Sequence, residues 1–181
     1  RGLGDVYKRQ NPTDTEFFNS PPKLSRAALT AFGMTRRPDH SAKDDQGLNA
    51  ILRAKTSTVC LVGKTWDYHV EVALKTNQEE AISIISDSVV EAVSAGKETV
   101  FDAEHFFDGW KANPDYARKT IQAAVEGGAM LVVMCDTNGG SLPEEITAIT
   151  QEALSAVDVP LGIHTHNDCD LAAANSCLLY T

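Results

Sequence analysis

Two histidines in one short segment carry the strongest chemical signal in the sequence. His164 and His166 follow the apolar residues 161–163 and precede Asn167 and Asp168. Alternate residues of a β-strand point to the same face, so the two imidazoles are predicted to lie side by side. Adjacent imidazoles are common ligands of divalent ions, and this segment therefore predicts a metal site. A hydrogen-bonded pair of core histidines is the alternative, and none of the carboxylates is an obvious third ligand.

A pair of carboxylates with the same spacing lies earlier in the chain. Asp102 and Glu104 follow a short apolar run and share a face if the strand continues through them. Such a pair can transfer protons or orient a polar substrate. A solvated loop with Asp102 capping the next segment is the alternative. His105 would point the other way and is interpreted as structural.

A third segment pairs a strand tip with glycines. Asp136 and Thr137 end an apolar run, and residues 138–140 continue as Asn-Gly-Gly. The glycines permit close backbone approach, and the threonine hydroxyl with nearby N–H groups can hold a carboxylate. A left-handed turn would explain the glycines equally well, but it would not explain Asp-Thr.

A fourth segment, residues 63–70 with the sequence GKTWDYHV, is predicted to be a loop beside a strand end. Lys64 and His69 could line a pocket there, whereas Trp66 and Tyr68 are equally well explained as packing residues. For His69 a substrate contact and a local hydrogen bond remain equal alternatives. His40 is assigned no role.

Strands and helices must bring these four segments together, and the hydropathy pattern predicts where those strands and helices lie. Short apolar runs without polar alternation are typical of strands covered on both faces. They occupy residues 29–32, 58–62, 99–101, 130–134 and 161–163. Amphipathic stretches between them predict helices at residues 45–54, 77–95, 114–127 and 142–157, with Asn77 and Ser141 as caps. The alternation predicts an α/β fold with a parallel sheet.

The polar residues favour a barrel over an open sheet. They follow four separate strands, and a barrel gathers all carboxyl ends of its strands around one mouth. An open sheet would spread them along an edge. Neither GxGxxG nor GxxxxGK[ST] occurs, which weakens the phosphate-loop forms of the open sheet.

Composition limits the class of protein. The chain of 181 residues is 43% apolar and 23% charged, as expected for a globular domain. No apolar run approaches the roughly 18 residues of a membrane span, and no secretory start is visible, which favours the cytoplasm. A net charge of −9 argues against nucleic acid as a partner. The four cysteines, which form no CxxC pair, are predicted to be buried reduced thiols.

Both ends of the sequence look foreign to the rest. Residues 1–10 do not fit the periodicity that follows, and the chain stops at the apolar string CLLYT, residues 177–181. Both strings resemble translated adapter sequence and are predicted to be non-native. Residues 11–176 are then predicted to form one partial catalytic (β/α) barrel.

Six stretches together resemble the citramalate synthase branch of the isopropylmalate/homocitrate synthase superfamily, whose barrel is that of hydroxymethylglutaryl-CoA lyase. They are NPTDTEFF, LTAFGMTRR, GKTWDYHV, FDAEHFFDG, CDTNGG and GIHTHNDCDLAAANS, and they extend from residue 11 to residue 176. The resemblance implies a homodimeric TIM (β/α)₈-barrel acyltransferase that condenses acetyl-CoA with pyruvate. The products would be (R)-citramalate and CoA, in isoleucine biosynthesis.

The same resemblance assigns roles to individual residues. His164 and His166 match the two histidines that bind Mg²⁺ or Mn²⁺, or in some members Zn²⁺. Glu104 matches an acidic residue of the 2-oxo acid pocket, Thr137 matches the threonine that hydrogen-bonds the substrate carboxylate, and His69 matches a histidine in the loop after strand four.

The chain departs from the family pattern at its start. The Asp and Arg of the family's first strand have no counterpart, so the chain is interpreted as strands three to seven, lacking the first two and the last. No general base is assignable, and the fragment alone is expected to be inactive.

Several functions remain open. Isopropylmalate synthase, homocitrate synthase and the lyase share the barrel and the paired histidines, with isopropylmalate synthase as the main alternative. A non-catalytic metal-binding barrel subunit is the alternative from another class.

Overall fold

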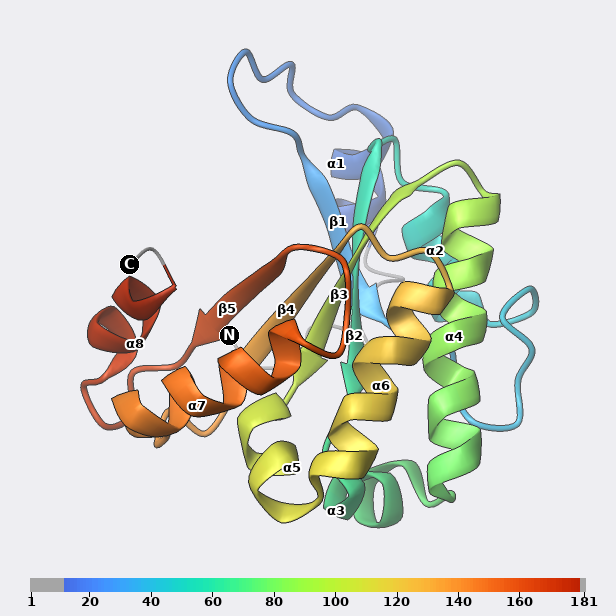
Figure 1. The fold of residues 1–181 in the computed structure, drawn as a ribbon. Helices are drawn as coiled ribbons and strands as arrows, with labels where there is room; N and C mark the ends of the chain where they lie inside the picture. The colour runs from blue at the N-terminus through green and yellow to red at the C-terminus, as the bar shows by residue number, and fades with distance from the viewer. Residues whose placement is uncertain (1–11, 180–181) are drawn as a thin grey trace.

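The computed structural model describes residues 12–179, and within them five parallel strands form one sheet in sequence order (Figure 1). The strands are β1 (Thr30–Met34), β2 (Thr58–Lys64), β3 (Glu98–Glu104), β4 (Leu131–Asp136) and β5 (Leu161–Thr165). Each strand pairs with the next one along the chain. An open doubly wound sheet would reverse its order at a switch point. Uninterrupted order is that of a (β/α) barrel, and the predicted partial barrel is confirmed.

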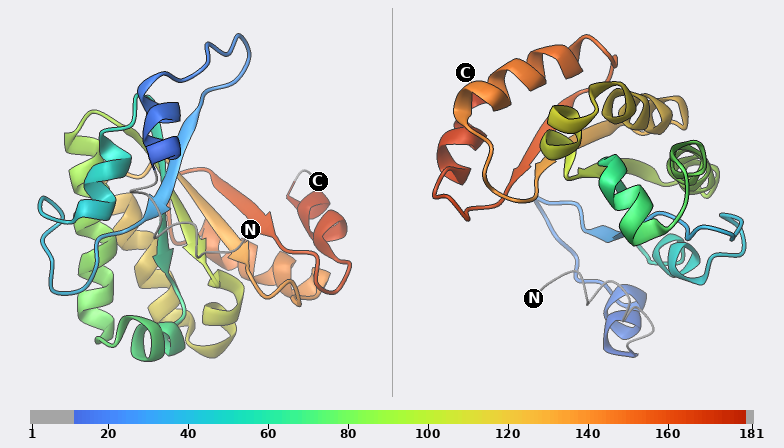
Figure 2. Two further views of the ribbon diagram at one scale, coloured as in Figure 1. Left: turned by 180° about the vertical axis from the view of Figure 1, so that it is seen from behind. Right: turned by 90° about the horizontal axis from the view of Figure 1, so that it is seen from below.

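The helices between consecutive strands lie on one side of the curved sheet, as the right-hand view of Figure 2 shows. The elements are α1 (Pro12–Asn19), α2 (Gln46–Leu52), α3 (Asp67–His69), the π-helical turn η2 (Val70–Leu74), α4 (Gln78–Ser94), α5 (Phe106–Ala112), α6 (Pro114–Glu126), α7 (Pro143–Leu154) and α8 (Ala172–Leu178). No helix of the described residues is both long and apolar enough to cross a membrane.

Local sequence explains the helix starts. The side chain of Asn77 accepts a hydrogen bond from the backbone N–H of Glu80, as predicted, and Asp45 caps α2 in the same way through Leu48. The predicted cap Ser141 is wrong. Its hydroxyl instead donates to Asp136, because the glycine-containing turn folds Ser141 back onto the end of β4.

Alternation along each strand divides the sheet into two faces. One set of side chains, which includes Leu61, Phe101 and Met134, is fully buried beneath the helices and forms the core. The intervening residues lie on the opposite face, where Phe32 on β1 is 46% exposed and His164 on β5 is also exposed. This second face, the inner face of the curved sheet, carries Lys64, Asp102 and Glu104 at its carboxyl end.

The observed strands differ from the predicted ones mainly at their carboxyl ends, which extend two or three residues further. Lys64, Glu104 and Asp136 still belong to the sheet. The segment predicted as a loop, residues 63–70, is the end of β2 followed by α3 and the first residue of η2. These polar residues looked like strand ends but are strand residues, of which Lys64 and Glu104 lie on the inner face and Asp136 lies on the face of Met134.

The cysteine prediction is wrong for two of four residues. Cys135 is buried and Cys60 is half-buried, but Cys169 and Cys177 are exposed. Cys169 lies in the loop after β5 and Cys177 lies in α8, both beyond the helix-covered core. None of the four described cysteines forms a disulfide.

The structure describes only a part of the two ends that are predicted to be foreign. Residues 1–10 lie outside the described residues, and their origin stays a prediction. At the other end α8 continues from Ser176 through Cys177 and Leu178 without a break.

Candidate active site

The two histidines predicted to act together lie at the carboxyl end of β5. The rings of His164 and His166 are stacked, with centroids 5.1 Å apart and an interplanar angle of 26°. The backbone N–H of His166 donates to the carbonyl of Asp136, 3.1 Å away, which ties this segment to the end of β4. Strand alternation therefore places both imidazoles side by side, as the sequence predicts.

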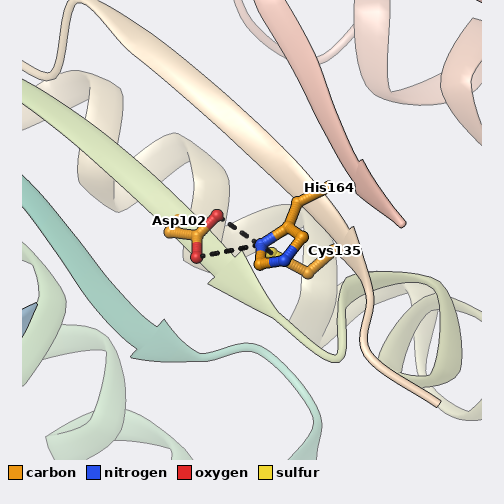
Figure 3. A group of neighbouring side chains, drawn as sticks. All are labelled: Asp102, Cys135 and His164. Atoms are coloured by element: carbon orange, nitrogen blue, oxygen red, sulfur yellow. Dashed lines mark hydrogen bonds and ion pairs between the residues drawn. The ribbon is translucent and has the colours of Figure 1, made fainter. Parts of the chain in front are cut away.

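A carboxylate and a thiol lie against the first of these rings (Figure 3). Asp102 Oδ2 is 3.5 Å from His164 Nδ1, and the Cys135 thiol donates to Asp102 Oδ1 over 3.0 Å. One ligand atom from each of the three residues lies within 4.8 Å of the others. The sequence offered no obvious third ligand beside the two histidines, and the fold places the carboxylate of Asp102 against Nδ1 of His164.

Ionisation in this group follows from its surroundings. The contact with Asp102 raises the pKa of His164 above its usual value, against the opposing effect of burial. Burial, together with the charge of Asp102, raises the pKa of Cys135, which therefore remains a thiol. The group offers an imidazole nitrogen and a carboxylate, with a protonated sulfur behind them.

A buried ion pair forms the next part of the site. Lys64 ends β2 and Glu104 ends β3 at the same register position, and their ammonium and carboxylate groups pair. Their side chains are 14% and 5% exposed, so neither charge is well solvated. The carbonyl of Glu104 also accepts from the hydroxyl of Thr65, over 2.7 Å. Sequence reasoning placed Glu104 in the site but did not foresee Lys64 as its partner.

Thr137 is held by the turn that ends β3. Its hydroxyl oxygen accepts the backbone N–H of His105 over 2.8 Å, which leaves the hydroxyl hydrogen available to another group. His105 adopts a left-handed conformation with φ of 60°, so the strand stops there. Its ring nitrogen Nδ1 lies 3.1 Å from a carboxylate oxygen of Asp108. His105 thus has a structural role, because its backbone N–H holds the hydroxyl of Thr137 in place.

His69 belongs to an aromatic cluster beside these residues. Its ring meets His105 edge to face at 4.3 Å between centroids, and Trp66 lies 5.0 Å away. Nδ1 of His69 is buried and has no hydrogen-bond partner. Burial lowers the pKa of His69, and the nearby His105 and Lys64 lower it further. The imidazole is therefore kept neutral, with one polar atom unsatisfied by the protein.

A pocket of about 460 Å³ opens beside Lys64, at the carboxyl ends of β1 and β2. Its lining includes Met34, Arg37, His40 and Leu74. His40, to which the sequence gave no role, is therefore a pocket residue. The carboxyl ends of β1 to β5 thus hold a pocket, an ion pair, a threonine hydroxyl and a pair of imidazoles.

Comparison with known proteins places this site in a family. Residues 27–180 match the HMGL-like family. The chain is 46% identical over 171 residues to an (R)-citramalate synthase of Aquifex aeolicus, covering 93% of the chain and 32% of that relative. It is 35% identical over 129 residues to a probable 2-isopropylmalate synthase of Methanopyrus kandleri, covering 71% of the chain and 25% of the relative. The chain therefore spans about a third of the length of the curated relatives it matches.

Solved structures agree on the fold. The HMG-CoA lyase of Brucella melitensis superposes with a TM-score of 0.76 at 14% identity, over 93% of the chain and 58% of the lyase. The family match covers most of the chain, and the fold agrees with it. The chain therefore belongs to the HMGL-like family.

Proposed function

We propose that the chain is part of a cytoplasmic acyltransferase that condenses acetyl-CoA with pyruvate to give (R)-citramalate and CoA, in the synthesis of isoleucine. The curated relatives at 41 to 46% identity carry the name (R)-citramalate synthase, and they support this reaction. The full-length protein is expected to be a homodimer.

The observation that carries the proposal is the stacked pair His164 and His166 beside the carboxylate of Asp102. The two imidazoles fit a divalent ion, because imidazole nitrogens bind Zn²⁺ and other first-row ions, and a carboxylate beside a ligating imidazole raises its basicity. His164 and His166 would hold the ion. When bound, a divalent ion polarises the carbonyl of a 2-oxo acid as a Lewis acid.

The other strand ends would bind and orient the acid. Thr137 has a free hydroxyl hydrogen with which it would donate to the substrate carboxylate. Glu104 and Lys64 would line the acceptor site, the buried pair giving fixed charges of both signs beside the pocket. His69 would contact the substrate through the accessible part of its ring, since Nδ1 is buried. The residue that takes the proton from the acetyl methyl group is left unassigned.

A second candidate is the condensation of acetyl-CoA with 2-oxoisovalerate, which gives 2-isopropylmalate. The 35% identity to the Methanopyrus kandleri relative favours it. The two reactions differ only in the acceptor side chain, a methyl group against an isopropyl group.

The test is a thiol-release assay on two proteins, the 181-residue chain and the longer protein that contains it. The longer protein should release CoA thiol from acetyl-CoA when pyruvate and Mg²⁺ or Mn²⁺ are present, and citramalate should accumulate. The chain alone should release none, because the expected metal-binding Asp and the Arg of the first family strand have no counterpart in it. If the longer protein released no thiol with any 2-oxo acid, the alternative of a non-catalytic metal-binding subunit would replace the proposal.

A further inference from the structure

Asp102 lies in the wall of the site, where both of its carboxylate oxygens face other side chains of the protein. Its side chain is 7% exposed and lies on the inner face in the carboxyl-terminal half of β3. Its Oδ1 accepts the thiol hydrogen of Cys135 on β4, and its Oδ2 faces Nδ1 of His164 on β5. The carboxylate therefore connects three adjacent strands through its two oxygens.

The surroundings of Nδ1 determine where the proton of a neutral His164 imidazole lies. The two groups near Nδ1 are the carboxylate at 3.5 Å and the Cys135 sulfur at 3.8 Å. The single thiol hydrogen already points to Asp102, over the shorter distance of 3.0 Å. Nδ1 therefore faces two hydrogen-bond acceptors, the carboxylate oxygen and the sulfur. A hydrogen on Nδ1 is favoured, because a lone pair on Nδ1 would be repelled by both.

The opposite ring nitrogen is then the free ligand atom. In Figure 3 the second nitrogen of the ring lies on the side away from the carboxylate. His164 is 48% exposed, so packing alone does not fix its ring, whereas the buried Asp102 can. Carboxylates that accept from one imidazole nitrogen fix the tautomer and ring orientation of metal-ligating histidines and raise their basicity.

We propose that Asp102 is a positioning residue that holds His164 as its Nδ1–H tautomer, so that Nε2 is presented to the divalent ion, and that the Cys135 thiol anchors this carboxylate. The inference deepens the proposed metal-dependent function and rests on it for the identity of the ligand. The tautomer itself is a property of the metal-free chain and is measured without activity.

The first test is long-range ¹H–¹⁵N NMR of the histidines in the metal-free 181-residue chain at about pH 9, where imidazoles are neutral. His164 should show a protonated Nδ1 and an unprotonated Nε2. Asp102→Ala should shift His164 toward the Nε2–H tautomer and leave His166 unchanged. Asp102→Asn should retain Nδ1–H, because the amide oxygen still accepts. Asp102→Leu, which fills the volume of the carboxylate, stands in for Asp102→Ala if the cavity prevents folding.

The anchor is tested with a matched pair. Cys135→Ser keeps a hydrogen-bond donor for Asp102 and should keep the tautomer, whereas Cys135→Ala removes the donor and should give a mixture of both tautomers. An unchanged tautomer in folded Asp102→Ala or Asp102→Leu would overturn the proposal. An unchanged single tautomer in Cys135→Ala would remove the anchoring role of the thiol.

The second test is calorimetric titration of the same variants with Mn²⁺. Loss of a carboxylate that orients a metal-ligating histidine typically weakens binding about 10- to 100-fold, and Asp102→Leu should fall in that range while Asp102→Asn recovers part of the affinity. If the wild-type chain binds no Mn²⁺, the titration is repeated with the longer protein, and absence of binding there removes the metal site of the proposed function. The NMR result still decides whether Asp102 sets the tautomer. Equal affinities in wild type and Asp102→Leu would overturn the positioning role.

Discussion

Lys64 and Glu104 form a buried ion pair across β2 and β3 at the point where both strands end. Each charge is poorly solvated, so each depends on the other for its stabilisation. The pair therefore stabilises the fold. It also holds one positive and one negative charge in fixed positions between the pocket and the inner face.

Replacing one member of this pair should destabilise the fold strongly. Lys64→Met is expected to lower the free energy of unfolding by about 3 to 5 kcal/mol, because Glu104 is left buried and unpaired. The double variant Lys64→Met with Glu104→Gln should recover much of that loss. Urea unfolding followed by circular dichroism measures both.

The control is a more exposed ion pair of the same chemistry. Lys111 and Glu145 lie 3.5 Å apart with side chains 37% and 35% exposed. Lys111→Met should cost at most about 1 kcal/mol. Additive losses in the double variant at Lys64 and Glu104 would mean that the two charges are not energetically coupled.

Removing either histidine of the stacked pair should impair metal binding without unfolding the chain. His164→Ala or His166→Ala is expected to weaken Mn²⁺ binding by about two orders of magnitude or more and nearly abolish turnover of the longer protein. Asp158→Ala, which removes an exposed carboxylate at the opposite end of β5, is the control. Wild-type metal affinity in either variant would show that the ion binds at another place.

His69 should make the chain less stable as the pH falls. Burial lowers its pKa, with a further contribution from His105 and Lys64, so the unfolded state takes up a proton near the ordinary pKa of 6.5 before the folded state does. The free energy of unfolding should therefore fall as the pH drops below that value, until the folded pKa is passed. Metal-free urea unfolding at about pH 7.5 and about pH 5.5 tests this in wild type and His69→Gln. The variant should lose less stability between the two pH values, and an equal loss would assign the pH dependence to other groups.

The longer protein should prefer pyruvate to 2-oxoisovalerate. A pocket closed around a methyl group discriminates by about 1 to 3 kcal/mol for each added methylene, and more where the larger group is excluded sterically. The ratio of kcat/KM for the two acids measures this directly. A ratio at or below one would identify the acceptor as the branched acid while leaving the fold and the histidine pair as described.

A close backbone contact should make Gly109 irreplaceable. A Cβ added there would lie 2.3 Å from the carbonyl oxygen of Thr65, so α5 could not approach the end of β2. Gly109→Ala is expected to cost about 1 to 3 kcal/mol or more. Gly140→Ala is the control, since its nearest atom, the sulfur of Cys169, would be 4.0 Å away. Equal melting temperatures for Gly109→Ala and wild type would show that α5 shifts freely.

The sequence was sufficient for the fold and for the side-by-side imidazoles, because both follow from local periodicity. Strand alternation alone brings His164 and His166 to one face. The contact between Asp102 and His164 could not be predicted so directly, since it depends on the register of β3, β4 and β5. The alternating inner-face positions Asp102, Cys135 and His164 were a usable signal once the sheet was assumed parallel and in order.

Other features depended on conformations that a hydropathy pattern does not encode. The left-handed turn at His105, which gives Thr137 its hydrogen bond, is unusual for a residue that is not glycine. The helical course of residues 67–74 was missed because its aromatic and charged residues resembled a loop.

The unbroken order of the strands has a consequence for how this chain acquires its structure. Each described strand pairs with the strand that precedes or follows it in the sequence. No pairing among them therefore depends on a distant segment that is synthesised later. Paired residues are about 30 to 40 positions apart in every case, so no pairing closes a loop longer than one strand–helix unit. Synthesis from the ribosome can therefore extend the sheet one unit at a time, with β2 and β3 already paired while β5 is still being translated.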